Sequence, residues 1–243
     1  MSSRLIYGFH AVTAKLRHDP DAVKEIFVDA ARHDARVRDL LAYAELQGVK
    51  VIAGDSRRLD GMVPGARHQG VIARVEGGRQ VAHLDDVLET LDEPAFLLVL
   101  DGVTDPRNLG ACLRVADAVG VHAVIAPRDR SAGLTDVALK AASGAAEAIP
   151  YVMVTNLART LRELREHDIQ VIGTSGEAQC DLYAAAWPPA TAWVLGAEGE
   201  GMRRLTRENC DQLVRIPMHG TVDSLNVSVA AGVCLFEARR RRS

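Results

Sequence analysis

The sequence contains few aromatic residues, which make up only 4% of its 243 positions. Proteins that bind exposed nucleobases commonly stack them on aromatic rings, so such stacking is not an obvious strategy for this chain. No apolar run approaches the roughly 18 residues that a membrane span requires. The first residues, MSSRLIYGFHAV, contain no apolar segment typical of a signal peptide. We therefore expect a soluble, cytoplasmic protein with no membrane partner.

Cysteine is also scarce, because Cys112, Cys180, Cys210 and Cys234 lie far apart and no CxxC pair occurs. Each lies in or beside an apolar helical pattern, so we expect buried, reduced thiols, as in a reducing cytoplasm. The eight histidines are scattered, with no HExxH motif and no Cys/His cluster at zinc spacing. We expect no metal site.

A strong excess of one charge is absent from the chain as a whole, since the formal net charge is -3. The charge is nevertheless uneven. Residues 1–79 carry 13 Lys and Arg against 10 Asp and Glu, whereas the remainder carries 16 against 22. The positive excess at the front hints at contact with a phosphate backbone there. We interpret the basic run Arg239–Arg242 as the solvated end of the last helix, with an RNA-binding tail as the alternative.

The chain divides into segments with different patterns. Residues 1–75 predict a small α/β domain whose first element is a helix after a turn at Gly8, and residues 76–94 predict a linker that leads into a short helix. From residue 95 to 243, near-continuous apolar strands alternate with helices. This alternation predicts an α/β fold, a parallel sheet with helices on both faces. We expect its strands at residues 95–101, 122–127, 148–154, 169–175, 191–196 and 212–218.

Polar and glycine-rich loops follow several of these strands. Ligands bind at the carboxyl ends of strands in parallel sheets, so these loops are candidates for a site. They read DGVTDPRNLGACLR (101–114), GAEGEGMRR (196–204) and IPMHGTVDSLNVS (216–228). A fourth loop, GTSGEA (173–178), is a weaker member of the set.

Several side chains in these loops have both an ordinary and a functional interpretation. Asn108 can cap the helix that follows it, or bind a ligand. Arg114 lies near a helix N-terminus, where a cation opposes the helix dipole, so we expect an anion or a carboxylate to hold it. Glu198 is either a solvated turn carboxylate or a site residue. Ser224 can cap the last helix, which leaves Asn226 without a capping role and indicates that the start of that helix lines a site.

Together, the loops DPRNLGACLR, GAEGEGM and IPMHGTVDSLNVSVAAG resemble the three motifs of the SPOUT-class RNA ribose 2′-O-methyltransferases, in the TrmH-like branch. The front end, with IYGFHAV and RHQGVIARV, resembles the small L30e-like domain that binds the RNA substrate in many of these enzymes. The resemblance covers essentially the whole chain, and three motifs in order are far more specific than one. It implies a C-terminal trefoil knot within residues 95–243, S-adenosylmethionine as cofactor, and a homodimer whose site draws on both chains.

The resemblance also assigns roles to residues. It implies cofactor contacts from Gly196, Ile216 and Leu225, with Thr174 and Gly176 as weaker candidates. It matches the catalytic and structural positions to Arg114, Asn108, Glu198, Ser224 and Asn226. Because a guanidinium is not readily deprotonated, we expect Arg114 to bind the target phosphate and stabilise a developing alkoxide. We expect Glu198 to order its loop or to hold Arg114 or Asn108, and Asn226 to fix the loop geometry.

The function that the resemblance implies is methyl transfer to the ribose 2′-hydroxyl of a guanosine in large-subunit ribosomal RNA. Transfer RNA is an alternative substrate, because enzymes of this branch share the catalytic motifs. A non-catalytic RNA-binding or ribosome-assembly module is a second alternative, but it would not need three such loops at one end of a sheet. A nucleotide-dependent oxidoreductase should carry GxGxxG after the first strand of the sheet, where this sequence reads LDGVTDP.

Overall fold

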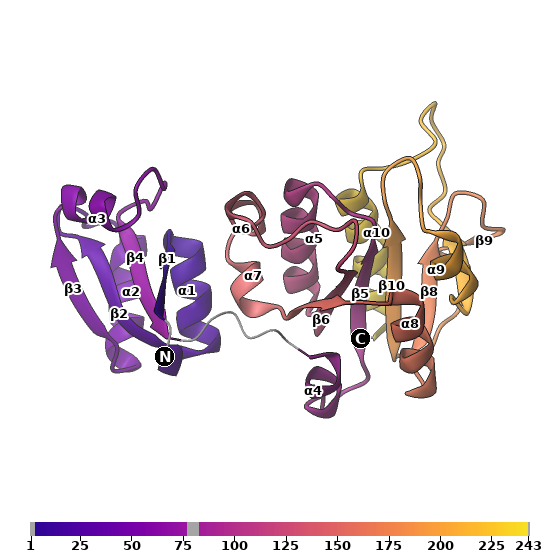
Figure 1. Cartoon of the computed structure of the whole chain (residues 1–243), viewed down its shortest axis with the longest axis horizontal. Coiled ribbons are helices and arrows are strands. Elements are labelled where there is room, and N and C mark those ends of the chain that lie inside the picture. The colour runs from indigo at the N-terminus through magenta and orange to yellow at the C-terminus, as the bar shows by residue number, and fades with distance from the viewer. Residues whose placement is uncertain (1–2, 77–82, 243) are drawn as a thin grey trace. The chain divides into compact units, whose positions relative to one another are not determined.

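The computed structural model of the chain describes residues 3–76 and 83–242, which form two compact units (Figure 1). Unit 1 contains Met1–Gln80 together with Ser143–Ala148, and unit 2 contains Val81–Ala142 and Ile149–Ser243. The glycine pair of the predicted linker lies outside the described residues. The short helix expected after it is α4, Leu84–Glu89.

Unit 1 is a four-stranded sheet in the order β1-β4-β2-β3. Strands β2 and β3 are parallel, and the other pairs are antiparallel. The strands are β1 (Ser3–Tyr7), β2 (Val23–Asp29), β3 (Lys50–Gly54) and β4 (Val71–Glu76), and the helices are α1 (Phe9–His18), α2 (Ala35–Leu46) and α3 (Ser56–Met62). Strand β1 was not predicted. Its five residues lie directly before the predicted helix, and they form a strand by pairing with β4, which is distant in the sequence.

Helices cover both faces of the unit 1 sheet. Ile26 and Val28 of β2 pack in one apolar cluster with residues of α1 and α2. Phe27, between them, packs in a second cluster with Leu59 of α3 and Ile72 of β4. Since successive side chains of a strand point to opposite faces, α1 and α2 cover one face and α3 covers the other.

A short segment from later in the chain completes unit 1. The predicted helix near residues 134–145 is broken, because Ser143 and Gly144 have positive φ angles of 50° and 96°. The break leaves α6 (Asp136–Ala142) in unit 2 and α7 (Ala145–Ala148) in unit 1. The Nη2 atom of Arg4 lies 2.7 Å from Oε2 of Glu147 on α7.

Unit 2 contains the predicted parallel sheet, with seven strands in the order β7-β6-β5-β10-β8-β11-β9. Every pair that forms it is parallel. The strands are β5 (Phe96–Asp101), β6 (Ala123–Pro127), β7 (Tyr151–Val154), β8 (Gln170–Thr174), β9 (Cys180–Asp181), β10 (Thr191–Gly196) and β11 (Gln212–Arg215). The two-residue β9 was not predicted; the other six lie within the expected ranges.

Helices also cover both faces of this sheet. Leu97 and Val99 of β5 pack in a cluster with the apolar residues of α4 and α8. Leu98 and Leu100, which point to the other face, are fully buried as well. On that side α5 packs against α6 and α10, and α10 packs against β10. The helices of unit 2 not yet given are α5 (Pro106–Val119), α8 (Leu157–Glu166), α9 (Arg204–Glu208) and α10 (Val227–Arg242).

The basic run at the end of α10 is not wholly solvated, which corrects part of our expectation. Arg241 stacks its guanidinium 4.0 Å from the ring centroid of Trp187 and donates to the Tyr183 carbonyl at 2.9 Å. The side chain of Arg242 is only 7% exposed and donates to the carbonyls of Pro94 and Pro189. These two arginines attach the last helix to the chain segments that precede β5 and β10.

The cysteines are free. Cys112 and Cys234 are buried, as predicted, whereas Cys180 and Cys210 are partly exposed. Within residues 3–76 and 83–242, no helix is long and apolar enough to cross a membrane.

Candidate active site

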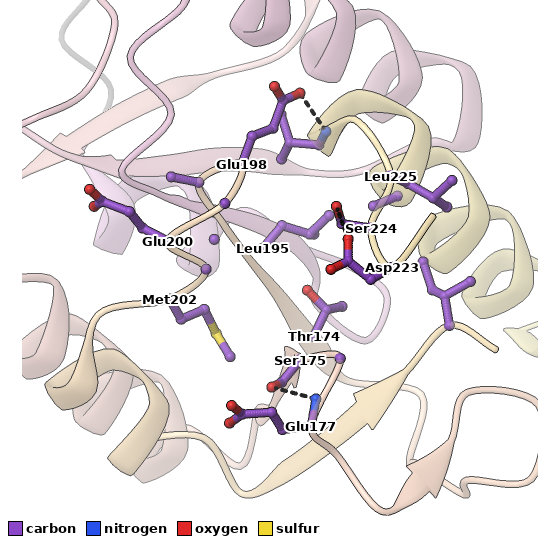
Figure 2. Close-up of a pocket in the computed structure, with 18 of the residues that line it drawn as sticks. Thr174, Ser175, Glu177, Leu195, Glu198, Glu200, Met202, Asp223, Ser224 and Leu225 are labelled. Atoms are coloured by element: carbon purple, nitrogen blue, oxygen red, sulfur yellow. Dashed lines mark hydrogen bonds between the residues drawn. The ribbon is translucent and has the colours of Figure 1, made fainter. Parts of the chain in front are cut away.

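A pocket of about 530 Å³ lies in unit 2 at the carboxyl ends of β8, β10 and β11 (Figure 2). Pockets of this size suit small molecules and cofactors. Residues of the second, third and fourth loops line it, including every residue for which the sequence predicts a cofactor contact: Thr174, Gly176, Gly196, Ile216 and Leu225. Glu198 and Ser224 line the pocket too, whereas Asn108, Arg114 and Asn226 do not.

The glycine-rich second loop is a tight hairpin at the pocket wall. Ala197 and Gly201 form an isolated antiparallel bridge, with N–H···O distances of 3.1 and 2.9 Å. Gly199 and Gly201 adopt φ angles of 80° and 67°, which favour glycine. A Cβ atom on Gly196 would lie 2.1 Å from the carbonyl carbon of Gly201. The hairpin can therefore close only with glycine at position 196.

Glu198, at the tip of this hairpin, joins all three main loops. Its Oε1 atom accepts from Nδ2 of Asn108 at 3.3 Å, from the backbone N–H of Val227 at 3.2 Å, and from Nδ2 of Asn226. Nδ2 of Asn226 also lies 3.0 Å from Oδ1 of Asn108. Figure 2 shows Glu198 directed toward the start of α10. Although exposed, Glu198 is thus not a solvated turn carboxylate.

The helix caps differ from those considered from the sequence. Asp105, rather than Asn108, caps α5, because its carboxylate accepts from the Arg107 N–H at 2.8 Å. Ser224 does not cap α10; its hydroxyl donates to Asp223 at 3.1 Å. Asn226 takes that position instead, and its Oδ1 accepts from the backbone N–H of Ser228 at 3.0 Å. Asn226 therefore both starts the helix and joins the cluster around Glu198.

Arg114 is the ninth of the 14 residues of α5, so it does not lie near the helix N-terminus as expected, and its side chain is exposed. Its side chain has no hydrogen bond and no ion pair with the described residues, so no carboxylate among them holds it there. Of the two partners considered for Glu198, the structure shows Asn108 and not Arg114. The guanidinium of Arg114 is free to meet an external anion.

The sequence patterns did not single out Asp101, the last residue of β5. Its side chain is fully buried, and it accepts from both the backbone N–H and the guanidinium of Arg203, at 2.8 and 2.6 Å. A charged residue at the end of an otherwise apolar strand was the available signal. Asp101 fixes the chain just after the glycine hairpin.

Most of the charged residues that line the pocket are acidic. Its carboxylates belong to Glu177, Glu198, Glu200 and Asp223, and its basic lining residue is Arg207. Arg207 is itself paired with Glu177 at 2.8 Å. The remaining negative charge favours a ligand that carries a positive group.

The thiol of Cys112 on α5 is buried and feels the charge of Glu198. Its burial, and then the charge of Glu198, raise its pKa to about 12. The thiol is therefore protonated near neutral pH, and a thiolate nucleophile is not available here.

Two family models match the chain. The model described as SpoU rRNA Methylase family matches residues 95–236, and the model described as RNA 2′-O ribose methyltransferase substrate binding matches residues 5–81. The first match alone covers more than half of the sequence, and it contains all the loops of the pocket. The chain belongs to the SpoU rRNA methylase family.

Curated relatives are similar over their full length. A protein of Ralstonia nicotianae named 23S rRNA (guanosine-2′-O-)-methyltransferase RlmB is 60% identical over 99% of this chain and 97% of its own length. The protein of the same name from Escherichia coli is 56% identical over 99% of this chain and 100% of its own length.

Solved structures share the fold. The SpoU methyltransferase AviRb from Streptomyces viridochromogenes, in complex with the cofactor AdoMet, aligns with a TM-score of 0.75 at 26% identity, over 99% of this chain and 90% of its own. The TrmH/SpoU tRNA modifying enzyme of A. aeolicus aligns with a TM-score of 0.56 at 28% identity, over 65% of this chain and 82% of its own.

Proposed function

We propose that this protein transfers a methyl group from S-adenosylmethionine to the ribose 2′-hydroxyl of a guanosine in 23S ribosomal RNA. One observation carries the proposal: Glu198 joins the three main loops at the mouth of a pocket lined by the expected cofactor residues. The names of full-length relatives at 55 to 60% identity give the substrate and the position of methylation.

The pocket fits S-adenosylmethionine in size and charge. Its volume of about 530 Å³ is in the range of cofactor sites, and its acidic lining complements a sulfonium cation. At Gly196 no side chain covers the backbone, so a ligand can approach it closely. A side chain there would collide with Gly201. When bound, this cofactor supplies a methyl group on a sulfonium, which is already a strong electrophile.

The chain's own task is then to place the ribose oxygen in line and to assist its deprotonation. Arg114 binds the phosphate of the target nucleotide and stabilises the developing alkoxide, while that phosphate or a water takes the proton. Glu198, Asn108 and Asn226 hold the three loops in place relative to one another. Ser224 lines the pocket beside Asp223. The free, exposed guanidinium of Arg114 supports this assignment.

We also propose a trefoil knot within residues 95–243. Strand β10 lies between β5 and β8, and β11 lies on the far side of β8. The chain then returns so that α10 packs against α5. The segment between β11 and α10 lines the pocket together with the loops that follow β8 and β10, which supports a path of the chain past these loops.

Residues 1–75 form, on this proposal, an L30e-like domain that binds the RNA substrate, and residues 76–94 link it to the methyltransferase domain. The match of residues 5–81 to a substrate-binding family supports this division. The enzyme acts in the cytoplasm, where free thiols such as those of this chain persist.

We propose that the enzyme is a homodimer whose site uses both chains. Val229 and Phe236 are seven residues apart on one face of α10, with 51% and 57% of their surface exposed. An exposed apolar stripe of this kind is typical of a contact surface. Arg114 lies on α5, which packs against α10, so a dimer formed through α10 brings Arg114 near the partner chain.

A methyl-transfer assay separates the proposal from its alternatives. Purified protein is incubated with labelled S-adenosylmethionine and either unmodified 23S ribosomal RNA or unmodified transfer RNA. We expect label in ribosomal RNA only. Label in transfer RNA alone would keep the reaction and overturn the substrate. Absence of cofactor binding in calorimetry would overturn the enzyme itself and favour a non-catalytic RNA-binding module.

A further inference from the structure

Basic residues in unit 1 differ in whether an acidic side chain neutralises them. Ion pairs at 2.5 to 3.3 Å hold the following residues: Arg4, Lys15, Lys24, Arg32, Lys50 and Arg74. Within residues 3–76, Arg57 and Arg58 of α3 and Arg67 of the loop after it are exposed and have no ion pair. We call these three residues the α3 surface.

The acidic groups beside the α3 surface are already engaged elsewhere. Asp55 caps α3 by accepting from the backbone N–H of Arg58 at 2.8 Å. Asp60 lies 3.0 Å from Nε2 of His68. Glu25, which is on the same sheet face as Phe27, is paired with both Lys50 and Arg74. The three arginines therefore keep their charge available for an external anion.

The loop that carries Arg67 is held in place by its neighbours. Nδ1 of His68 accepts from the Gly70 N–H at 3.0 Å, so Nε2 carries the proton and donates to Asp60 of α3. His68 is only 7% exposed. Arg32 donates to the carbonyl of Gln69, which has a positive φ of 55°. Ordering such a loop costs free energy. Its attachment to α3 therefore indicates that the position of Arg67 beside α3 serves a function.

Apolar groups adjoin these charges. The sheet face under α3 is covered by that one short helix, and Leu5, Ile52, Met62 and Val63 remain partly exposed around Phe27. The guanidinium of Arg58 lies 5.8 Å from the ring centroid of Phe27, which orients it along this face. Figure 1 shows α3 and the loop after it at the same end of the strands.

We propose that the α3 surface binds the sugar-phosphate backbone of the RNA substrate. Exposed arginines beside an apolar face are suited to phosphate, because a guanidinium donates two parallel hydrogen bonds to it. This inference rests on the proposed function only in taking RNA as the substrate. It identifies which side of unit 1 contacts the RNA.

Helix α2, on the opposite sheet face, supplies a matched control. Arg36 and Arg38 are exposed there and, within residues 3–76, have no ion pair. Asp34 caps α2 and pairs with Arg32, much as Asp55 caps α3, so both pairs of arginines have an engaged aspartate beside them. The two pairs therefore differ mainly in the sheet face on which they lie. Removing the two charges on α2 changes the net charge by the same amount as removing those of Arg57 and Arg58.

The test measures the affinity of the full-length protein for unmodified 23S ribosomal RNA at several salt concentrations. The variants are Arg57→Gln with Arg58→Gln, Arg36→Gln with Arg38→Gln, and Arg57→Lys with Arg58→Lys. Each phosphate contact contributes about 0.7 to 0.9 to the slope of log K against log salt. We expect the first pair to lower that slope by about 1.5 and to weaken binding on the order of tenfold near 0.15 M salt. We expect Arg67→Gln to give about half of this change in slope.

The control pair should change affinity by less than about twofold, since it breaks no phosphate contact. The lysine pair should keep the slope, because it keeps the charge, but should lose part of the affinity, because lysine cannot bind a phosphate bidentately. Equal losses of affinity in both glutamine pairs would show a diffuse charge effect and overturn the proposal. An unchanged affinity in the first pair would overturn it as well. Cofactor binding and methyl transfer by the unmodified protein are measured separately, so failure of the proposed function is seen independently.

Discussion

Asp101 and Arg203 form an ion pair that links residues 102 positions apart in the sequence. The Asp101 carboxylate is fully buried at the end of β5, whereas the Arg203 side chain is 39% exposed just after the glycine hairpin. One oxygen of Asp101 accepts from the Arg203 backbone at 2.8 Å and the other from its guanidinium at 2.6 Å. The pair therefore fixes the hairpin that forms one wall of the pocket against the strand before the first motif.

Replacing Asp101 tests whether this pair positions the cofactor loop. We expect Asp101→Asn to lower the free energy of unfolding by about 2 kcal/mol, less than the roughly 3 to 5 kcal/mol of a fully buried pair, because Arg203 is partly solvated. We also expect weaker S-adenosylmethionine binding in calorimetry at a temperature where the variant is folded. Arg204→Gln is the control, since its pair with Glu208 is exposed and is worth under about 1 kcal/mol. Unchanged cofactor affinity in Asp101→Asn would mean that the pair is only structural.

Glu198 should support catalysis because one of its oxygen atoms, Oε1, holds three loops together. Glu198→Ala removes the acceptor shared by Asn108, Asn226 and the Val227 N–H, and we expect kcat to fall on the order of a hundredfold. Glu198→Gln retains a carbonyl oxygen at that place and should retain more activity. Single-turnover methylation rates measure both. If the two variants lose activity equally, the charge of Glu198 is required, and its role as an acceptor is not sufficient.

Arg114 should need its planar guanidinium. We expect Arg114→Lys to lose nearly all methyl transfer, on the order of a hundredfold, because lysine cannot bind a phosphate bidentately. Arg162→Lys is the control, since Arg162 is another exposed arginine in unit 2. The measurement is the methylation rate with saturating cofactor. Retention of most activity by Arg114→Lys would contradict bidentate positioning.

Gly196 should tolerate no side chain. Gly196→Ala places a Cβ 2.1 Å from the Gly201 carbonyl carbon, so we expect the hairpin to open and cofactor binding to be lost. Gly133→Ala adds the same atom where no other atom lies within 4 Å. Calorimetric binding of S-adenosylmethionine should therefore be normal in Gly133→Ala. Normal binding in Gly196→Ala would show that the hairpin does not shape the cofactor site.

Arg242 should stabilise the fold and contribute nothing to RNA binding. Its buried side chain donates to carbonyls of Pro94 and Pro189, which Arg242→Ala would leave without a partner. We expect a loss of about 2 kcal/mol in the free energy of unfolding. Arg240→Ala removes an exposed arginine beside it and should cost under about 1 kcal/mol. A fall in the salt dependence of RNA binding in Arg242→Ala would support the RNA-tail alternative instead.

The sequence was sufficient for the elements whose signals are local. The apolar runs of unit 2 predicted six of its strands, and their ends predicted the loops that surround the pocket. Strand β1 was missed because its pairing with β4 depends on residues far apart in the chain. The strand order, in which β10 separates β5 from β8, has no local signal either.

The roles of individual polar residues were harder to predict, because each depends on backbone geometry. Asn108 and Ser224 are good capping residues by type, yet Asp105 and Asn226 occupy the positions at which a cap is needed. The cluster of Glu198 with Asn108 and Asn226 brings together three separate loops. Only its members could be proposed from the motifs, and their contacts required the fold.

Nucleoside analysis of the methylated RNA tests the central claim most directly. Unmodified 23S ribosomal RNA is treated with labelled S-adenosylmethionine and either the unmodified protein or Glu198→Ala, then digested and examined by mass spectrometry. We predict labelled 2′-O-methylguanosine with the unmodified protein and almost none with the variant. Label on a base, on another nucleoside, or at equal levels with both proteins would contradict the account.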